Sequence, residues 1–201
     1  MTAVITFYHN PRSRAQMAHW MLEEAGADYE IRHVDFEKGD NRTPEFLAIN
    51  PMGKLPTIVH EGVVVTECAA IIAYIADLFP YSGLAPAPGT PARGSYYRWL
   101  FFGAGCIDPA VLDKMFDRPL PEQKGAVGYG SYEDMLGAIE RALKPGPYLL
   151  GAQFSAADVY IASQLNWAGL FGAPGIKESA AIQNYVRLCT SRPAFQKTQQ
   201  A

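Results

Sequence analysis

Apolar and polar positions in the first eighty residues follow two alternating spacings, which predicts strands and helices in turn. Residues 4–8 form a short apolar run typical of a buried strand, and residues 29–35 alternate like a second strand. Between these strands, apolar residues recur at helical spacing until Gly26, a common helix stop. The polar piece at 37–50 predicts irregular structure with one helical turn.

A β-hairpin and a further helix are predicted next. Residues 55–59 and 63–66 flank Glu61-Gly62, a pair typical of a tight hairpin turn. The helix that follows carries an apolar face and stops at Pro80. The order β-α-β followed by β-β-α predicts a parallel strand pair with a right-handed crossover and an antiparallel edge. This is the thioredoxin-like arrangement.

Proline and glycine crowd residues 81–94, so we expect a linker there. Beyond it nearly every pattern is helical, and a helical bundle is the simplest packing. The predicted helices cover residues 96–105, 131–143, a segment from Ser155 and 179–190. The expected fold is therefore α+β with two domains: a thioredoxin-like domain at 1–80, the linker at 81–94 and an all-helical domain at 95–201.

Composition and charge argue against several other classes of protein. Of the 201 residues 49% are apolar, which suffices for a sizeable core, and the net charge of −3 disfavours nucleic acid or an anionic membrane as partner. No apolar run reaches the roughly 18 residues that span a bilayer, and residues 1–7 lack the features of a secretory signal. The three cysteines show neither a Cys-x-x-C pair nor metal-ligand spacing. We therefore expect no disulfide framework, no metal and a cytoplasmic location.

The Leu55-Pro56 pair stands where the first hairpin strand is predicted to begin. Proline lacks an N–H, so Pro56 must start that strand or lie at a sheet edge. A cis bond would turn the backbone of Leu55 outward and leave its N–H and C=O free for a peptide ligand. An ordinary trans bond is the alternative, and on this motif alone it is favoured, because only about 5–6% of X–Pro bonds are cis.

Thr66-Glu67-Cys68 precedes the last helix of the first half. Thr66 is expected to be the N-cap, which would place Glu67 and Cys68 in the first helical turn. Free N–H groups there can bind a carboxylate while Glu67 binds an ammonium group, so the turn suits an amino-acid headgroup. The alternative is an ordinary capped helix with an acidic first turn, which is the better interpretation of this motif alone.

Ser13 lies where the first strand turns into the first helix, and its hydroxyl is suited to stabilising a bound thiolate. A free thiol with a pKa near 8.5 is only about 3% ionised at pH 7. One hydrogen bond to a charged group contributes about 1.5–3 kcal/mol, which lowers a pKa by about one to two units. The alternative, better on this residue alone, is that Ser13 only caps the helix.

Aromatic residues crowd the helix expected at 96–105, where the sequence does not separate core from pocket lining. They are Tyr96, Tyr97, Trp99, Phe101 and Phe102. For any one of them the core is the safer interpretation. Residues 154–158 form a capping-box pattern after a hydrophobic residue, and we assign this motif to stability rather than chemistry.

Taken together, the ordered motifs resemble the cytosolic glutathione S-transferase family, in its bacterial-type and serine-type form. The resemblance runs over nearly the whole chain. The motifs that carry it are residues 7–14 (FYHNPRSR), 20–26 (WMLEEAG), 50–56 (NPMGKLP), 66–71 (TECAAI) and 154–158 (FSAAD). Each motif is weak alone, but the ordered set with its spacings is specific.

The resemblance implies how glutathione binds. Leu55 would pair its backbone with the cysteinyl part of glutathione, beside a cis Pro56. Glu67 and Cys68 would hold the γ-glutamyl headgroup, although the family usually has Ser or Thr where this chain has Cys68. A thiol is a weak hydrogen-bond partner, so the backbone N–H would contribute more here. Two further side chains fall where the family binds the glycyl carboxylate, those of Asn41 and Lys54.

The resemblance also implies two rival residues for activating the thiol. Ser13 falls where serine-type classes keep their hydroxyl, with Arg14 adding positive charge nearby. Tyr8 falls near the activating phenol of tyrosine-type classes, and we prefer Ser13 by its resemblance to serine-type sequences. The apolar pocket for the electrophile would lie between the domains, lined by Tyr97 and Phe101.

The predicted function is conjugation of glutathione thiolate to small hydrophobic electrophiles, with glutathione as co-substrate and no other cofactor. Family members are usually homodimers that act in detoxification, and the resemblance implies the same here. One alternative is a glutathione-dependent disulfide or peroxide reductase on the same scaffold, although no Cys lies at the first-helix turn. Another is a non-catalytic binding or assembly module. Isomerases of the family typically carry a Ser-Ser-Cys run at the first helix, which this chain lacks.

Overall fold

The computed structural model describes residues 4–199 of the chain. It divides into two compact units. One contains the residues up to Gly83 together with the segment from Pro193 onward, and the other runs from Leu84 to Arg192. The fold class expected from the sequence is confirmed, because the first unit holds a mixed sheet with helices and the second is helical.

The sheet of the first unit has the strand order β2-β1-β3-β4. Its strands are β1 (Ile5–His9), β2 (Tyr29–His33), β3 (Thr57–His60) and β4 (Val63–Thr66). β1 pairs parallel with β2 and antiparallel with β3, and β3 pairs antiparallel with β4. The predicted parallel crossover and antiparallel edge are confirmed. Glu61 and Gly62 both have positive φ, which gives the hairpin the twist that a two-residue turn requires.

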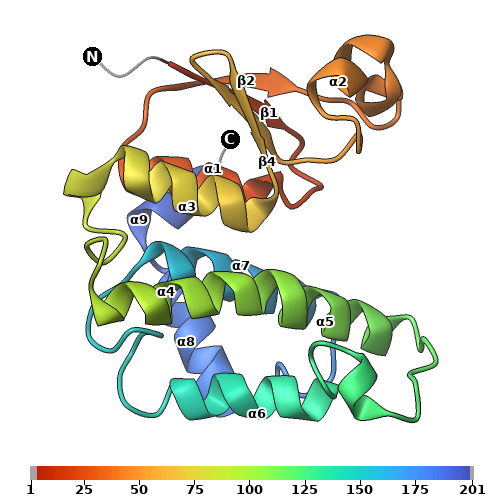
Figure 1. Cartoon of the computed structure of the whole chain (residues 1–201), viewed down its shortest axis with the longest axis vertical. Coiled ribbons are helices and arrows are strands. Elements are labelled where there is room, and N and C mark those ends of the chain that lie inside the picture. The colour runs from red at the N-terminus through yellow and green to blue at the C-terminus, as the bar shows by residue number, and fades with distance from the viewer. Residues whose placement is uncertain (1–3, 200–201) are drawn as a thin grey trace. The chain divides into compact units, whose positions relative to one another are not determined.

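Two long helices, α1 (Ala15–Ala25) and α3 (Cys68–Leu78), lie side by side along the sheet (Figure 1). α1 ends at Gly26, whose left-handed φ of 64° needs no Cβ, as predicted for a helix stop. The apolar side chains of β1 and of both helices form a continuous core. Its largest fully buried members are Trp20, Phe7, Ile5, Met21, Leu22, Ile58, Ile71, Ile72 and Ile75.

Two local predictions in this unit are wrong. The piece at 37–50 is more helical than expected, since it contains η1 (Asp40–Arg42) and α2 (Pro44–Ile49). The hydroxyl of Thr43 caps α2, and Pro44 occupies its first turn. Both residues are local signals for a helix start, although the polar composition of this piece predicts irregular structure. Thr66 is not an N-cap, because it is the last residue of β4 and Glu67 occupies the cap position.

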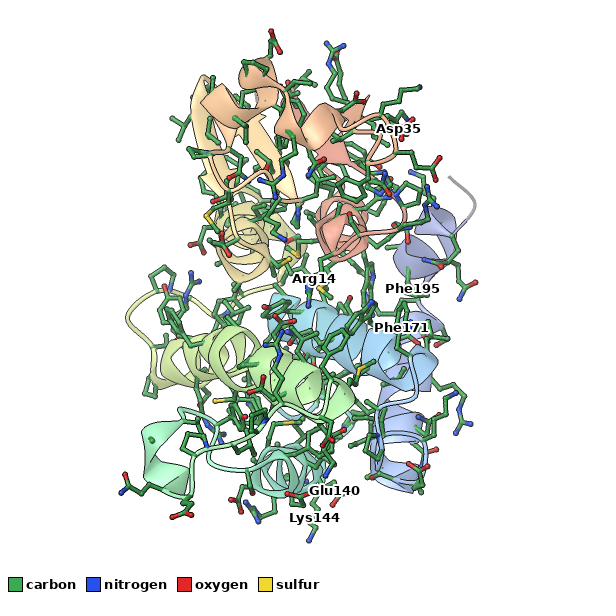
Figure 2. The ribbon with its side chains drawn as sticks, turned by 90° about the vertical axis from the view of Figure 1, so that its right-hand side faces the viewer. Arg14, Asp35, Glu140, Lys144, Phe171 and Phe195 are labelled. Carbon is green, nitrogen blue, oxygen red and sulfur yellow. The ribbon has the colours of Figure 1, made fainter. Side chains whose placement is uncertain are left out.

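The C-terminal helix α9 (Pro193–Thr198) contacts α1 of the first unit. The sequence pattern instead predicts that residues 95–201 form one helical domain. Phe195, labelled in Figure 2, meets Trp20 edge to face, with 4.9 Å between ring centroids. Helix α9 therefore completes the core of the first unit. A helix of six residues that begins at Pro193 has too few apolar positions for its pattern to predict this contact.

The second unit is built from α4 (Pro91–Phe102), η3 (Gly103–Ile107), α5 (Asp108–Met115), α6 (Tyr132–Ala142), α7 (Ala156–Leu170) and α8 (Ala180–Thr190). A short 3-10 turn covers Lys124–Ala126 in this unit, and another covers Pro80–Ser82 at the end of the first unit. α4 and α7 lie side by side (Figure 1), and Gly103 allows this approach, because a Cβ there would meet Tyr160 at 2.5 Å. α4 begins inside the segment expected to be a linker, since proline suits a first helical turn.

The capping box at the start of α7 is confirmed. The Asp158 carboxylate accepts hydrogen bonds from the N–H and hydroxyl of Ser155, the N–H of Leu149 and the hydroxyl of Tyr185. Asp158 is fully buried, so these bonds compensate for a carboxylate removed from water. Within residues 4–199, no helix has both the length and the apolar character needed to cross a membrane.

Candidate functional site

One end of the sheet gathers the N-terminal motifs. Tyr8 is level with Thr57 across the β1–β3 pair, and Thr57 is level with Thr66 across the β3–β4 pair. The turn after β1, the Leu55-Pro56 pair before β3 and the Glu67-Cys68 pair after β4 therefore meet at the same sheet edge. Segments as far apart in sequence as Ser13 and Glu67 converge through strand register alone.

Ser13 lies in the turn between β1 and α1 and is half-buried. Its hydroxyl donates to the main-chain carbonyl of Asn10 at 2.7 Å and accepts from the N–H of Ala15 at 3.1 Å. The hydroxyl thus satisfies the start of α1, as the capping interpretation predicted, although the cap position itself is occupied by Arg14. A thiolate ligand would compete with the Asn10 carbonyl for the same proton.

Tyr8 projects from β1 on the face opposite to Phe7 and His9, which alternate with it along the strand. Its ring meets Phe46 of α2 edge to face, with centroids 5.5 Å apart. Phe7 and His9 instead contact His19 of α1. The two rival activating residues therefore belong to different surroundings, one beside α2 and the other at the start of α1.

The Leu55–Pro56 bond is cis, as the resemblance implied. Within residues 4–199, neither the N–H nor the C=O of Leu55 forms a hydrogen bond, although the residue is buried. Leu55 lies just before β3, at the end of this interior strand, where its unpaired main-chain groups are suited to pair with the main chain of an extended peptide. The pair is thus a ready partner for a peptide ligand.

Asn50 holds this loop and is a residue that sequence reasoning did not select as part of the site. It is buried, and its side-chain NH₂ donates to the Lys54 carbonyl at 2.9 Å and to the Thr57 hydroxyl at 3.0 Å. Its side-chain oxygen accepts from the N–H of Met52 at 3.1 Å. Its position at the head of the Pro-Met-Gly-Lys turn is the sequence signal that could have revealed it.

Asn41 and Lys54 differ in their freedom to reach a ligand. The side chain of Asn41 donates to the main-chain carbonyl of Gly53 at 2.9 Å, so it supports the loop that carries Lys54. Gly53 has a φ of 61°, and a Cβ there would approach the Asn41 carbonyl to 2.7 Å. The side chain of Lys54 is exposed, so its positive charge is accessible to a ligand that binds beside this loop.

Glu67 and Cys68 begin α3 beside the start of α1. Glu67 is exposed and has a φ of 66°, a backbone conformation that non-glycine residues seldom adopt and that often occurs at ligand sites. The Cys68 thiol lies 3.9 Å from the main-chain carbonyl of Arg14. Cys68 therefore links the N-termini of α1 and α3. The first main-chain N–H groups of α3 have no partner within the helix, and they point outward from its N-terminus.

The aromatic helix of the second unit separates into two faces. Tyr96 and Trp99 are buried, as the core interpretation predicted. Tyr97 and Phe101 are 42% and 72% exposed and lie one helical turn apart on α4. They form an apolar surface strip on this helix.

A buried polar chain in the first unit was not predicted. The ring of His19 bonds to the hydroxyl of Tyr29 at 2.9 Å, and that hydroxyl donates to Glu23. His9 lies beside His19, with ring centroids 5.2 Å apart, and burial together with the His19 charge lowers the pKa of His9 to about 4. No group of three or more His, Cys, Asp and Glu side chains in the described part of the chain is arranged to hold a metal ion.

Comparison with known proteins gives matches in both units of the chain. Residues 3–77 match the glutathione S-transferase N-terminal domain and residues 116–188 match the C-terminal domain. Glutathione S-transferase 3 of Zea mays is 31% identical over 191 residues, covering 89% of this chain and 85% of the relative. The disulfide-bond oxidoreductase YfcG of Escherichia coli is 27% identical, covering 95% and 92%.

Solved structures show the same similarity. A sphingomonad glutathione S-transferase complexed with glutathione is 30% identical, with a TM-score of 0.79 and 97% of each chain covered. The fold, the gathering of the motifs at one sheet edge and the matches over both units thus agree. This chain belongs to the glutathione S-transferase family.

Proposed function

We propose that this protein is a glutathione transferase that conjugates the glutathione thiolate to small hydrophobic electrophiles, such as activated aryl halides or epoxides. The observation that carries the proposal is the meeting of three glutathione-type motifs at one sheet edge. The peptide-binding groups of Leu55, the carboxylate of Glu67 and the N-terminus of α3 suit the cysteinyl and γ-glutamyl parts of glutathione.

Glutathione would bind in an extended conformation. The main chain of Leu55 would pair with its cysteinyl residue, and Glu67 would bind its ammonium group. Helix α3 would offer main-chain N–H groups to the γ-glutamyl carboxylate, while Lys54, supported by Asn41, would attract the glycyl carboxylate. The sulfur would then face the β1–α1 turn, where Ser13 donates its hydroxyl and Arg14 adds positive charge.

The chemistry needs only that the thiol be ionised and held beside the electrophile. A hydrogen bond from Ser13 to the sulfur contributes about 1.5–3 kcal/mol, which lowers the thiol pKa by about one to two units. The exposed strip of Tyr97 and Phe101 would offer apolar contact to the electrophile. We also propose that the enzyme acts as a cytoplasmic homodimer.

A pH titration of the bound thiol tests this function. Thiolate absorbance of glutathione bound to the wild type should titrate at least one pH unit below free glutathione. Ser13→Ala should raise that midpoint by about one unit or more and reduce conjugation of an aryl halide at pH 6.5 about tenfold. Tyr8→Phe should change neither, and the opposite pattern would assign activation to Tyr8.

A matched control is Ser82→Ala, because the Ser82 hydroxyl also donates to a main-chain carbonyl at 2.7 Å but lies outside the site. It should leave both readouts unchanged. Absence of glutathione binding by the wild type would reject the proposed function itself.

The second candidate function is glutathione-dependent disulfide reduction. The similarity to the Escherichia coli disulfide-bond oxidoreductase supports it. It needs the same glutathione site but a disulfide in place of the electrophile. Turnover of a small disulfide and of an aryl halide, assayed side by side with the same preparation, distinguishes the two reactions.

A further inference from the structure

Asn10 occupies the point where β1 turns away from β2 toward α1. It is only 8% exposed, and its side-chain NH₂ donates to the carbonyl of Val34 at 2.8 Å. The N–H of Val34 in turn donates to the carbonyl of His9 at 2.9 Å. The Asn10 side chain therefore continues the strand pairing by one residue beyond the ends of both strands, and it fixes the place where the chain bends.

The rest of Asn10 organises the turn that contains Ser13. Its side-chain oxygen accepts from the N–H of Arg12 at 2.9 Å. Its main-chain carbonyl accepts from the N–H of Ser13 at 3.1 Å and from the Ser13 hydroxyl at 2.7 Å. One buried amide thus determines the position of the carbonyl to which the Ser13 hydroxyl is bonded.

The oxygen of Ser13 is held separately from its proton. It accepts the N–H of Ala15 at 3.1 Å, a bond that stays intact when the hydroxyl rotates about the Cβ–Oγ bond. The proton can therefore move from the Asn10 carbonyl to a nearby sulfur without a change in the backbone. The cost of this exchange depends on how rigidly the turn holds both oxygen atoms.

We propose that Asn10 is a positioning residue that acts through Ser13. It keeps the hydroxyl at a fixed distance from the glutathione sulfur and holds its proton on a carbonyl until the thiolate accepts it. The proton stays on Ser13 throughout, and only its acceptor changes. This inference rests on the proposed function, since it needs glutathione bound with its sulfur at the turn.

The test is a double-mutant cycle with Asn10→Ala and Ser13→Ala, read on the pH midpoint of bound thiolate. Asn10→Ala should raise the midpoint by about one unit, which is about a tenfold loss of thiolate at neutral pH. It should cause no further rise when Ser13 is already alanine. Its KM for glutathione should stay within about twofold, while its kcat falls at pH 6.5 and recovers at high pH.

Two further measurements separate positioning from general stability. Asn10→Asp keeps the acceptor for the Arg12 N–H but loses the donor to Val34, so its midpoint should lie between those of the wild type and Asn10→Ala. It also serves if Asn10→Ala does not fold. Amide hydrogen exchange should be faster at Arg12 and Ala15 in Asn10→Ala, whereas in Asn10→Asp it should be faster at Ala15 and unchanged at Arg12. The control Asn184→Ala, at an exposed asparagine of α8, should change neither the thiolate midpoint nor the amide exchange rates.

The outcomes are distinct. An equal midpoint rise from Asn10→Ala in both Ser13 backgrounds, or no rise in either, overturns the positioning role. A wild type that ionises glutathione while Ser13→Ala does so equally well also overturns it, yet leaves the transferase function standing. A wild type that does not bind glutathione rejects the proposed function itself and, with it, this inference.

Discussion

The ammonium group of Lys197 lies 2.6 Å from a carboxylate oxygen of Glu23, and this pair joins the last helix of the chain to the first. The other carboxylate oxygen of Glu23 accepts the hydroxyl of Tyr29. The Glu23 side chain is only 10% exposed. Burial alone would raise the pKa of Glu23, but the hydrogen bonds from Lys197 and Tyr29 outweigh it and lower the pKa.

Lys197→Ala should therefore destabilise the first unit by about 1–2 kcal/mol at pH 7, because a nearly buried carboxylate loses its cation. A carboxyl whose pKa is lowered by folding stabilises the folded state at pH values above its unfolded pKa of about 4.3. The stability lost in Lys197→Ala should therefore become smaller as the pH falls below that value. Urea unfolding followed by tryptophan fluorescence at pH 7 and pH 4 measures both effects. The exposed Lys38–Asp35 pair is the control, since Lys38→Ala should cost less than about 1 kcal/mol.

His9 should make the protein sensitive to acid. Its side chain is 3% exposed, and burial and the charge of His19 lower its pKa from 6.5 to about 4, with the exposed His33 contributing less. As the pH falls from about 6.5 to 4, His9 is protonated in the unfolded chain but stays neutral in the folded chain. The free energy of unfolding therefore decreases across that pH window. The loss reaches about 3 kcal/mol.

The variant His9→Phe keeps a ring in the core and removes the titration. Its unfolding free energy should fall less than that of the wild type between pH 7 and pH 4.5. His33→Gln should retain most of the acid sensitivity, because His33 is the exposed member of the cluster. Equal pH profiles for wild type and His9→Phe would show that other groups cause the acid sensitivity.

Asp158→Ala should be the most destabilising of these substitutions. It leaves buried donors of Leu149, Ser155 and Tyr185 without an acceptor, and each such group costs about 1–3 kcal/mol. A loss of about 3 kcal/mol or more is expected in urea unfolding. The control is Asp134→Ala, which removes the equivalent carboxylate beside Ser131 at the start of α6 but is exposed, and it should cost about 1 kcal/mol or less.

Cys68→Ser should strengthen glutathione binding. A hydroxyl is a stronger hydrogen-bond partner than a thiol, and a gain of about 1 kcal/mol corresponds to about fivefold in Kd. Isothermal titration with glutathione measures the change. Cys106→Ser, at a half-buried cysteine of the second unit whose thiol also contacts a carbonyl, should leave Kd unaltered. Weaker binding by Cys68→Ser would mean that the sulfur itself favours the ligand.

The sequence by itself determined the order and type of most elements. Apolar spacing identifies α1, Gly26 identifies its end, and Glu61-Gly62 identifies the hairpin, because each depends on interactions between residues close in the chain. The capping box at Ser155 and Asp158 is local in the same way. The glutathione motifs were recognised by resemblance, residue by residue.

Tertiary structure alone decided which of these residues meet. The register of Tyr8 with Thr57 and of Thr57 with Thr66 brings the three motifs to one sheet edge, and no local pattern encodes that register. No local pattern encodes the ion pair of Lys197 with Glu23 or the hydrogen bond from the Asn10 side chain to the Val34 carbonyl. Nor does a local pattern predict that Tyr96 of α4 is buried while Tyr97 is exposed. These contacts join residues far apart in sequence, or depend on what packs against a helix. Their free energy therefore exists only once the chain has folded.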